Sequence, residues 1–387
     1  MKTSISSSII EGFKDTTRAD IMKWRNALKT AQHPTDPRSH YLQDLYDNLE
    51  SDGHFVAQKE LRKGATLGYD FSIVDRKSGE LNQEKTDLFR EEWFYNFLSM
   101  ALDSIFRGYT LIELTDTKVL HFERIPYRNV VGKNSRIYPD VMGNKFIDYS
   151  KGFESTLIQI GQPDSLGIMA DICGQLIWKR NAQQSWAEFT ERFGMPLISA
   201  TTSKTSKADI EQIDQMLASL GEAARAVLPE GTTISIQPFT GGDSFQVFDT
   251  QIERINAEIS KPIVGGTMVS DDGSSRSQSE VHERNLDDKL SEADRRMISF
   301  VVNGQLIPML AKWGFPVNPD SDKFQFNQSF ELDLTQHWNI VNQMISQGYE
   351  VDEKWLSQTF NVPITGRTRV ESGENREERQ SLYRNFR

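Results

Sequence analysis

The sequence has very little cysteine and no long apolar run. Cys173 is the only cysteine among 387 residues, which excludes an internal disulfide and a cysteine-rich metal site. No window approaches the roughly 20 apolar residues that span a bilayer, and the N-terminus lacks an apolar segment of signal-peptide length. We therefore expect a soluble protein of a reducing, intracellular compartment. Cys173 lies in an apolar run with Ile168, Met169 and Ile172, which favours a buried structural thiol over a nucleophile.

Common catalytic motifs are absent as well. The chain contains no GxxxxGK[ST] phosphate loop, no GxSxG elbow and no HExxH zinc pair. Gly265 and Gly266 lack the lysine and the preceding buried strand of a phosphate loop, so we interpret them as a backbone hinge. The six histidines are isolated from one another, and His282 fits a surface or interface role better than that of a general base. We expect no cofactor and no catalytic residue.

The chain also lacks a positive net charge. Its 55 acidic and 44 basic residues give a net charge of −11. Proteins that hold DNA by its phosphates usually present a basic surface, so this chain is a poor candidate for a sequence-reading DNA binder. An acidic wall could still surround DNA and let it slide, although ordinary solubility charge explains the composition equally well. Seven tryptophans and 22 phenylalanines indicate that the chain folds.

The first 165 residues predict a polar arm and an α+β unit. Residues 1–40 are polar, and Pro34 and Pro37 break any helix there, so we expect an arm followed by a turn. Apolar residues at helical spacing predict helices over 40–67 and 85–107. Short runs between turn residues predict strands over 69–75, 109–115, 120–131, 136–143 and 156–161.

The middle of the chain predicts two helices that flank a compact insert. The first helix covers 166–193 and ends at Gly194 and Pro196. The insert has a predicted helix over 206–228 and two predicted strands over 231–239 and 243–249. The second helix begins at Thr250 and is stopped by Pro262. If the two helices pack side by side, they form a stalk that carries a cap.

The last third begins with a polar loop over 269–280. A helix of about nine turns follows to Trp313, with a mixed stripe of apolar residues and a charged opposite face. A strand is predicted over 324–333, then short helices over 335–349 and 352–360. The charged tail is expected to be mobile.

Three segments are more specific together than any one alone. Residues 178–201 form a helix that ends in Phe-Gly-x-Pro before a strand. Residues 251–310 contain the turn ISKPIVGGT and the helix start SQSEVH, and residues 349–363 end in WLSQTFNVP. In this order and at these separations they resemble the portal proteins of Mu-type tailed bacteriophages. That family often has glutamine where this chain has Gly266.

The resemblance implies an α+β portal-type fold with wing, stem, clip, channel loop and crown. It divides the chain into an N-terminal arm (1–40), an α+β wing (41–165), stem helix 1 (166–194), an αβ clip insert (195–249), stem helix 2 (250–264), a channel loop (265–280), a long helix with a return to the wing (281–332), crown-like helices (333–365) and a charged tail (366–387).

The resemblance also implies roles for particular residues. The channel loop is flexible and polar and carries a single basic residue, and its residues are Ser270, Asp271, Asp272, Ser274, Arg276 and Ser277. The hinge consists of Pro262, Gly265 and Gly266. The stem would pack through Trp178, Trp186 and Phe189; Trp178 and Trp186 could alternatively stack on nucleic-acid bases, but helix packing fits better.

The implied assembly is a homo-oligomeric ring of about twelve copies at one capsid vertex, built in the host cytoplasm and retained in the virion. Double-stranded DNA would pass through it without sequence specificity. Its partners would be the large terminase subunit, head-tail connector proteins and the major capsid or scaffold proteins, with no membrane. Two alternatives stay open: a metal-dependent nucleic-acid-processing enzyme that uses Asp271, Asp272 and Glu280, and another head or neck structural protein.

Overall fold

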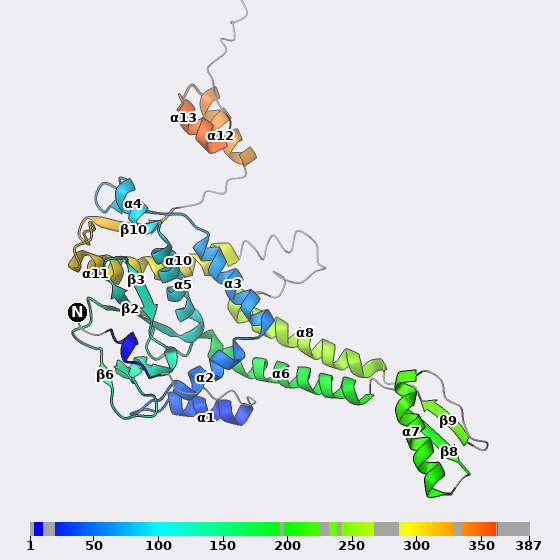
Figure 1. Ribbon diagram of the computed structural model, residues 1–387. Coiled ribbons are helices and arrows are strands. Elements are labelled where there is room, and N and C mark those ends of the chain that lie inside the picture. Colours follow the sequence, from blue (N-terminus) through cyan, green and yellow to red (C-terminus); the bar gives the residue numbers. More distant parts are fainter. Residues whose placement is uncertain are drawn as a thin grey trace, which may run out of the picture. The chain divides into compact units, whose positions relative to one another are not determined.

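A computed structural model describes residues 4–10, 20–193, 197–203, 205–223, 232–237, 242–266, 286–327, 334–360 and 362. The chain divides into two compact units, Met1–Asn327 and Gln328–Arg387, and each is described by itself. The first unit contains helices together with small antiparallel sheets, which confirms the expected α+β class (Figure 1).

Helices dominate the front of the first unit: α1 (Ile21–Ala31), α2 (His40–Leu49), α3 (Gly53–Leu67), α4 (Gln83–Phe89) and α5 (Glu92–Arg107). Helix α1 lies in the region expected to be a polar arm. Asp20 caps it by accepting a hydrogen bond from the Lys23 N–H at 2.6 Å, and Ala27 is buried against the core. The single helix expected from residue 40 is divided in two, because Asp52 caps a new helix at the Phe55 N–H.

The strands of the first unit follow most of the predicted runs. They are β1 (Phe71–Asp75), β2 (Tyr109–Asp116), β3 (His121–Arg124), β4 (Val130–Val131), β5 (Arg136–Ile137), β6 (Ile147–Asp148), β7 (Leu157–Gly161) and β10 (Asp322–Phe326). They form a β3-β2-β7 sheet, a β4-β5-β6 sheet and a β1-β10 pair, all antiparallel. In the β1-β10 pair Phe71 lies opposite Phe326.

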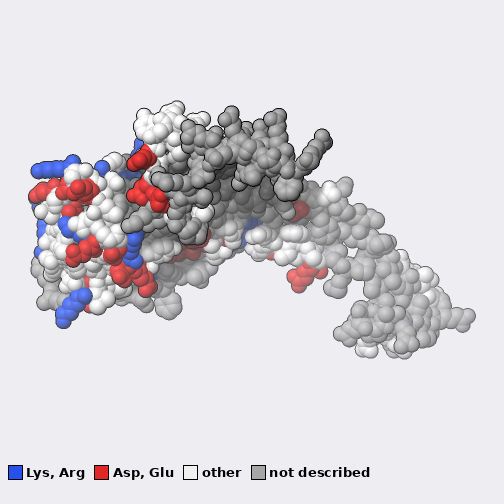
Figure 2. Space-filling view, turned by 90° about the horizontal axis from the view of Figure 1, so that it is seen from above, with Lys and Arg blue, Asp and Glu red and all other residues white. Residues whose placement is uncertain are grey.

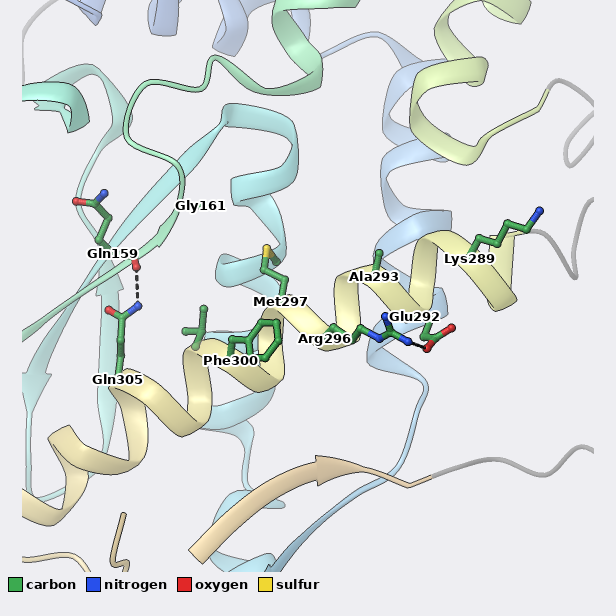
Figure 3. A pocket seen from close by; sticks show the side chains of 10 residues that line it. Gln159, Gly161, Lys289, Glu292, Ala293, Arg296, Met297, Phe300 and Gln305 are labelled. Carbon is green, nitrogen blue, oxygen red and sulfur yellow. Dashed lines mark hydrogen bonds and ion pairs between the residues drawn. The ribbon is translucent and has the colours of Figure 1, made fainter. Parts of the chain in front are cut away.

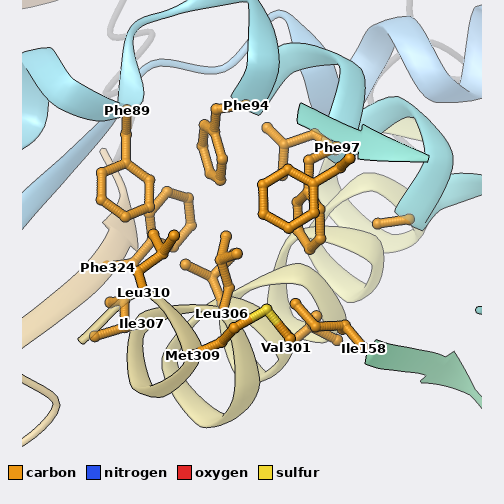
Figure 4. Close-up of a cluster of buried hydrophobic side chains, with 14 of the residues drawn as sticks. Phe89, Phe94, Phe97, Ile158, Val301, Leu306, Ile307, Met309, Leu310 and Phe324 are labelled. Atoms are coloured by element: carbon orange, nitrogen blue, oxygen red, sulfur yellow. The ribbon is translucent and has the colours of Figure 1, made fainter. Parts of the chain in front are cut away.

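The main core lies between α5 and the long helix near the end of the first unit (Figure 4). Apolar residues of α5 recur at helical spacing, so that Phe94, Phe97, Ala101 and other members of this stripe are buried. The long helix runs as a π-helical segment (Leu286–Ser291), α10 (Glu292–Val301), a second π-helical segment (Val302–Leu306) and α11 (Ile307–Lys312). Its described part therefore confirms the helix expected up to Trp313.

A glycine crossing fixes the point where α5, β7 and the next helix meet. Gly108 and Gly167 both have positive φ angles, +90° and +67°. A Cβ atom on Gly167 would lie 2.2 Å from the Phe106 carbonyl oxygen, and one on Gly108 would lie 2.1 Å from the Ser165 carbonyl oxygen. Only residues without a Cβ allow this approach, so these glycines set where the long helix α6 (Gly167–Phe193) leaves the core.

The insert between the two long helices contains β8 (Leu197–Thr202), α7 (Lys207–Ala223) and β9 (Thr232–Gln237). The two strands pair antiparallel, with Leu197 opposite Gln237 and Thr202 opposite Thr232. The strand predicted over 243–249 is wrong, because these residues belong to helix α8 (Gly242–Val264). Phe248, Ile252, Ile255 and Ile259 continue one helical stripe, which a short run of alternating residues concealed.

The second unit contains α12 (Leu334–Ser346) and α13 (Glu353–Phe360), close to the two short helices that the sequence predicts. Helix α12 ends in a Schellman motif. Gly348 has a φ of +91°, its N–H bonds the Ile345 carbonyl at 3.0 Å, and the Tyr349 N–H bonds the Met344 carbonyl at 3.1 Å.

Candidate functional site

The long helices α6 and α8 lie side by side and form the most extended feature of the first unit (Figure 1). Residues of α6 pack on Ile255, Ile259 and Ile263 of α8, and the α6 residues in this contact are Met169, Ile172, Cys173, Leu176 and Ile177. At 1.5 Å per residue, helices of 27 and 23 residues are roughly 40 and 35 Å long. Farther out, the rings of Phe189 and Phe248 lie 6.0 Å apart. The expected two-helix pair is therefore present.

Polar contacts fix α6 to the turn between α2 and α3. The Lys179 ammonium lies 2.7 Å from an Asp52 carboxylate oxygen, and both side chains are largely buried. The Arg180 guanidinium donates to the Asn48 carbonyl and to the Ser51 hydroxyl, each at 2.9 Å. On α8, Ser260 lies 2.7 Å from the His54 ring Nε2. These contacts hold the inner ends of both helices.

A buried ion pair joins the end of α8 to the start of the following long helix. The Arg62 guanidinium of α3 donates from Nε and Nη2 to the two Asp294 carboxylate oxygens at 2.9 and 3.0 Å. Its Nη1 donates to the Ile263 carbonyl at 2.9 Å. The exposed fractions of the Arg62 and Asp294 side chains are 8% and 6%. Arg62 therefore links the two helical segments that precede and follow residues 267–285.

The hinge residues differ in their surroundings from the expectation. Pro262 does not stop the helix, because α8 continues through it to Val264. A proline near the last turn lacks an N–H, so it removes one helical hydrogen bond, yet its fixed φ is compatible with the helix. Gly265 has a φ of +76°, and its N–H bonds the Lys261 carbonyl at 3.0 Å. The chain turns at Gly265, whereas hinge motion at Pro262, Gly265 and Gly266 stays a prediction.

The expected channel-loop residues lie outside the described residues. These are Ser270, Asp271, Asp272, Ser274, Arg276 and Ser277, together with Glu280 of the alternative metal-site hypothesis. Among the residues that the structure describes, no group of three or more His, Cys, Asp and Glu side chains could hold a metal ion. Nor is any described helix long and apolar enough to cross a membrane.

The predicted stem-packing residues fall into two groups. Phe189 contacts α8 through Phe248, and Trp186 is partly buried. Trp178 is 50% exposed and is not among the residues of the α6–α8 contact. The inner part of that contact consists of smaller aliphatic residues and Cys173. Burial raises the pKa of the Cys173 thiol to about 12, in agreement with the expected structural thiol.

A groove runs between the edge strand β7 and helix α10 (Figure 3). Its volume is about 510 Å³, and Met297, Phe300 and Gln305 contribute to its lining. The Gln305 side chain donates to the Gln159 carbonyl of β7 at 2.9 Å. Phe300 is 76% exposed. An exposed phenylalanine beside a strand edge is a surface on which another chain can pack.

Charges on the described surface are mixed. On the face that Figure 2 shows, basic and acidic side chains of described residues are interspersed rather than gathered by sign. This distribution offers no extended phosphate-binding stripe on that face, as the acidic net charge of the chain predicted.

Sequence reasoning missed the contacts that hold the helix pair. Arg62 and Asp294 are separated by 232 positions, and neither lies in a motif. Glu113 of β2 was missed as well, although its carboxylate accepts the backbone N–H groups of Ile5 and Ser6 at 2.7 and 2.8 Å. No local pattern identifies such partners, because each pairing is created by the tertiary fold.

Known proteins share this sequence pattern and this arrangement. The family described as the portal protein of Mu bacteriophage matches residues 43–362. The Mu-like prophage FluMu protein gp29 of Haemophilus influenzae is 20% identical over 344 residues. The match covers 82% of this chain and 66% of that protein, so this chain spans just under two thirds of the curated relative.

Two solved structures have a similar fold. One is a chain from the neck of an empty GTA particle computed with C6 symmetry, with a TM-score of 0.54. The other is from the neck of a native GTA particle computed with C12 symmetry, with a TM-score of 0.51. Each match is 12% identical and covers 89% of this chain and 100% of the other.

Proposed function

This chain belongs to the Mu bacteriophage portal protein family, and on that premise we propose that it is one subunit of the portal ring of a tailed phage or prophage. About twelve copies surround a channel at one capsid vertex. Genome DNA enters through this channel during packaging and leaves through it during infection. The family match over residues 43–362 carries the proposal, and the C6 and C12 symmetries of the neck particles with a similar fold support a ring.

The helix pair supports this function through its geometry. In the ring, α6 and α8 form the stem, and the β8–α7–β9 insert forms the clip that meets the large terminase subunit and later the head-tail connector proteins. The first unit provides the wing, and α12 and α13 provide the crown next to the capsid. The Arg62 clamp holds the two helices from which the channel loop extends.

The chain acts as a structural component rather than an enzyme. ATP hydrolysis belongs to a separate motor, in keeping with a sequence that has no phosphate-binding loop. DNA passes without sequence-specific binding, because the net charge of −11 disfavours tight phosphate contacts. The ring assembles in the host cytoplasm and stays at the portal vertex of the virion.

Loop deletion tests this function directly. Removing residues Asp271–Ser277 is expected to leave ring assembly intact and to reduce the amount of DNA packaged per particle. Ring formation is measured by electron microscopy of the purified chain, and packaging by nuclease-protected DNA. Unchanged packaging in intact rings would contradict the role of the loop in the channel. Loss of the rings would show that the loop is structural.

A further inference from the structure

Helix α12 carries no acidic or basic residue other than His337. Its sequence, LTQHWNIVNQMIS, contrasts with a chain in which 26% of the residues are charged. Its polar residues Asn339, Asn342, Gln343 and Ser346 gather on one side, and apolar residues occupy the other side. A helix of this composition presents an apolar face that has to be covered.

Helix α13 covers only part of that face. Val341 is buried, and the Trp338 ring contacts the Phe360 ring edge to face, with the centroids 5.6 Å apart. Among the residues of the second unit whose burial the structure describes, Val341 is the one buried side chain. Two short helices with so small a core do not stay folded alone, because the buried area is too small to offset the chain entropy.

The uncovered part is a continuous apolar patch. Ile340 and Met344 lie one turn apart and are 45% and 46% exposed, and Ile345 is 45% exposed. The Schellman motif returns the chain over the same end of the helix, where Tyr349 is 63% exposed and its N–H bonds the Met344 carbonyl. We call these four residues the α12 patch.

We infer that the α12 patch packs against the α12–α13 unit of a second copy of this chain. An uncharged apolar patch is matched by another uncharged helix, whereas the face of the first unit in Figure 2 carries interspersed charges. Because α13 covers one side of α12 and the patch lies on the adjacent side, each copy can offer the patch to its neighbour. Such a head-to-tail contact is the kind that closes a ring. The inference rests on the proposed function only for the ring, which brings the copies together at high effective concentration.

Site-specific photo-crosslinking of the full-length chain tests the partner. A photoreactive phenylalanine replaces Met344 in one preparation and Asn342, an exposed residue on the polar side of α12, in another. We expect position 344 to give covalent multimers whose crosslinked peptides join residue 344 to residues 334–360 of another copy. Position 342 should give at least about tenfold less of this product. Crosslinks from 344 to residues 1–327, or equal yields from the two positions, would overturn the inference.

A pair of substitutions provides a second measurement. Met344→Glu places a charge in the patch, and Asn342→Glu places the same charge on the polar side. In assembled protein, hydrogen exchange of the amides of residues 338–346 should become at least about tenfold faster in Met344→Glu and stay within about twofold in Asn342→Glu. Equal exchange in the two variants would contradict self-association through the patch.

The outcomes separate this inference from the proposed function. Rings that form while position 344 crosslinks only to the first unit would leave the portal proposal standing and refute the α12 contact. Crosslinked multimers without rings would support the contact and contradict the portal proposal. A chain that stays monomeric and uncrosslinked would contradict both.

Discussion

Removing the Arg62 side chain should strongly destabilise the first unit. In Arg62→Met, the two bonds to Asp294 and the bond to the Ile263 carbonyl are lost. Asp294 then keeps a charge in a site where its side chain is 6% exposed. Breaking a buried pair by removing one partner costs about 3–5 kcal/mol, most of it from the charge left behind.

The matched variants isolate that cause. Arg62→Met combined with Asp294→Leu removes both charges and leaves mainly the Ile263 carbonyl unpaired, at a cost of about 1–3 kcal/mol. The double variant should therefore be more stable than Arg62→Met alone. Arg90→Met breaks an exposed pair with Asp70, in which the side chains are 45% and 62% exposed. It should cost less than about 1 kcal/mol.

Urea unfolding followed by tryptophan fluorescence, at one fixed protein concentration, measures these free energies. If Arg62→Met costs no more than Arg90→Met, or if the double variant is less stable than the single one, the clamp does not hold the helices as described. The same preparations can be imaged for rings, since the clamp joins the elements that flank the channel loop.

Three further predictions follow from local geometry. Gly167→Ala should destabilise the chain by more than about 2 kcal/mol, since its Cβ would lie 2.2 Å from the Phe106 carbonyl, whereas Gly64→Ala in the open middle of α3 should stabilise it by up to about 1 kcal/mol; thermal unfolding compares them, and a tolerated Gly167→Ala would refute the glycine crossing. Glu113→Leu should release the N-terminal segment, because the carboxylate accepts hydrogen bonds from Ser4, Ile5 and Ser6; faster hydrogen exchange of the Ile5 and Ser6 amides reports this, and unchanged exchange would count against the anchor. Cys173 should stay unreactive to thiol reagents at pH 8 in the native chain and react after denaturation, because its raised pKa of about 12 keeps it protonated; its contribution to stability is complete below about pH 9 and declines as the pH rises from there to 12, and rapid native labelling would contradict its burial.

The periodic elements of this fold could be predicted from the sequence, because their own residues carry the signal. Helix α5 has a broad apolar stripe, and β1, β2 and β7 are short apolar runs bounded by turn residues. The stretch 243–249 was misassigned because a short alternating run fits a strand as well as a helix, and contact with Phe189 and the continuation into α8 favour the helix. Pro262 shows a similar limit, since a proline in the last turn can be accommodated when the flanking isoleucines are packed in the core.

The site could be predicted only in outline. The helix pair and the polar segment between α8 and the next helix follow from hydrophobic periodicity and composition. The contacts that fix them do not, because Arg62, Lys179 and Glu113 acquire their partners only when distant segments meet. The glycine crossing is hidden for the same reason. Gly108 and Gly167 look like ordinary helix ends until the two backbones are brought within contact distance.

The assembly state of the purified full-length chain tests the portal proposal most directly. Negative-stain electron microscopy, together with light scattering, should show rings of about twelve copies with a central channel. A protein that remains a monomer at high concentration in both measurements would contradict the proposal.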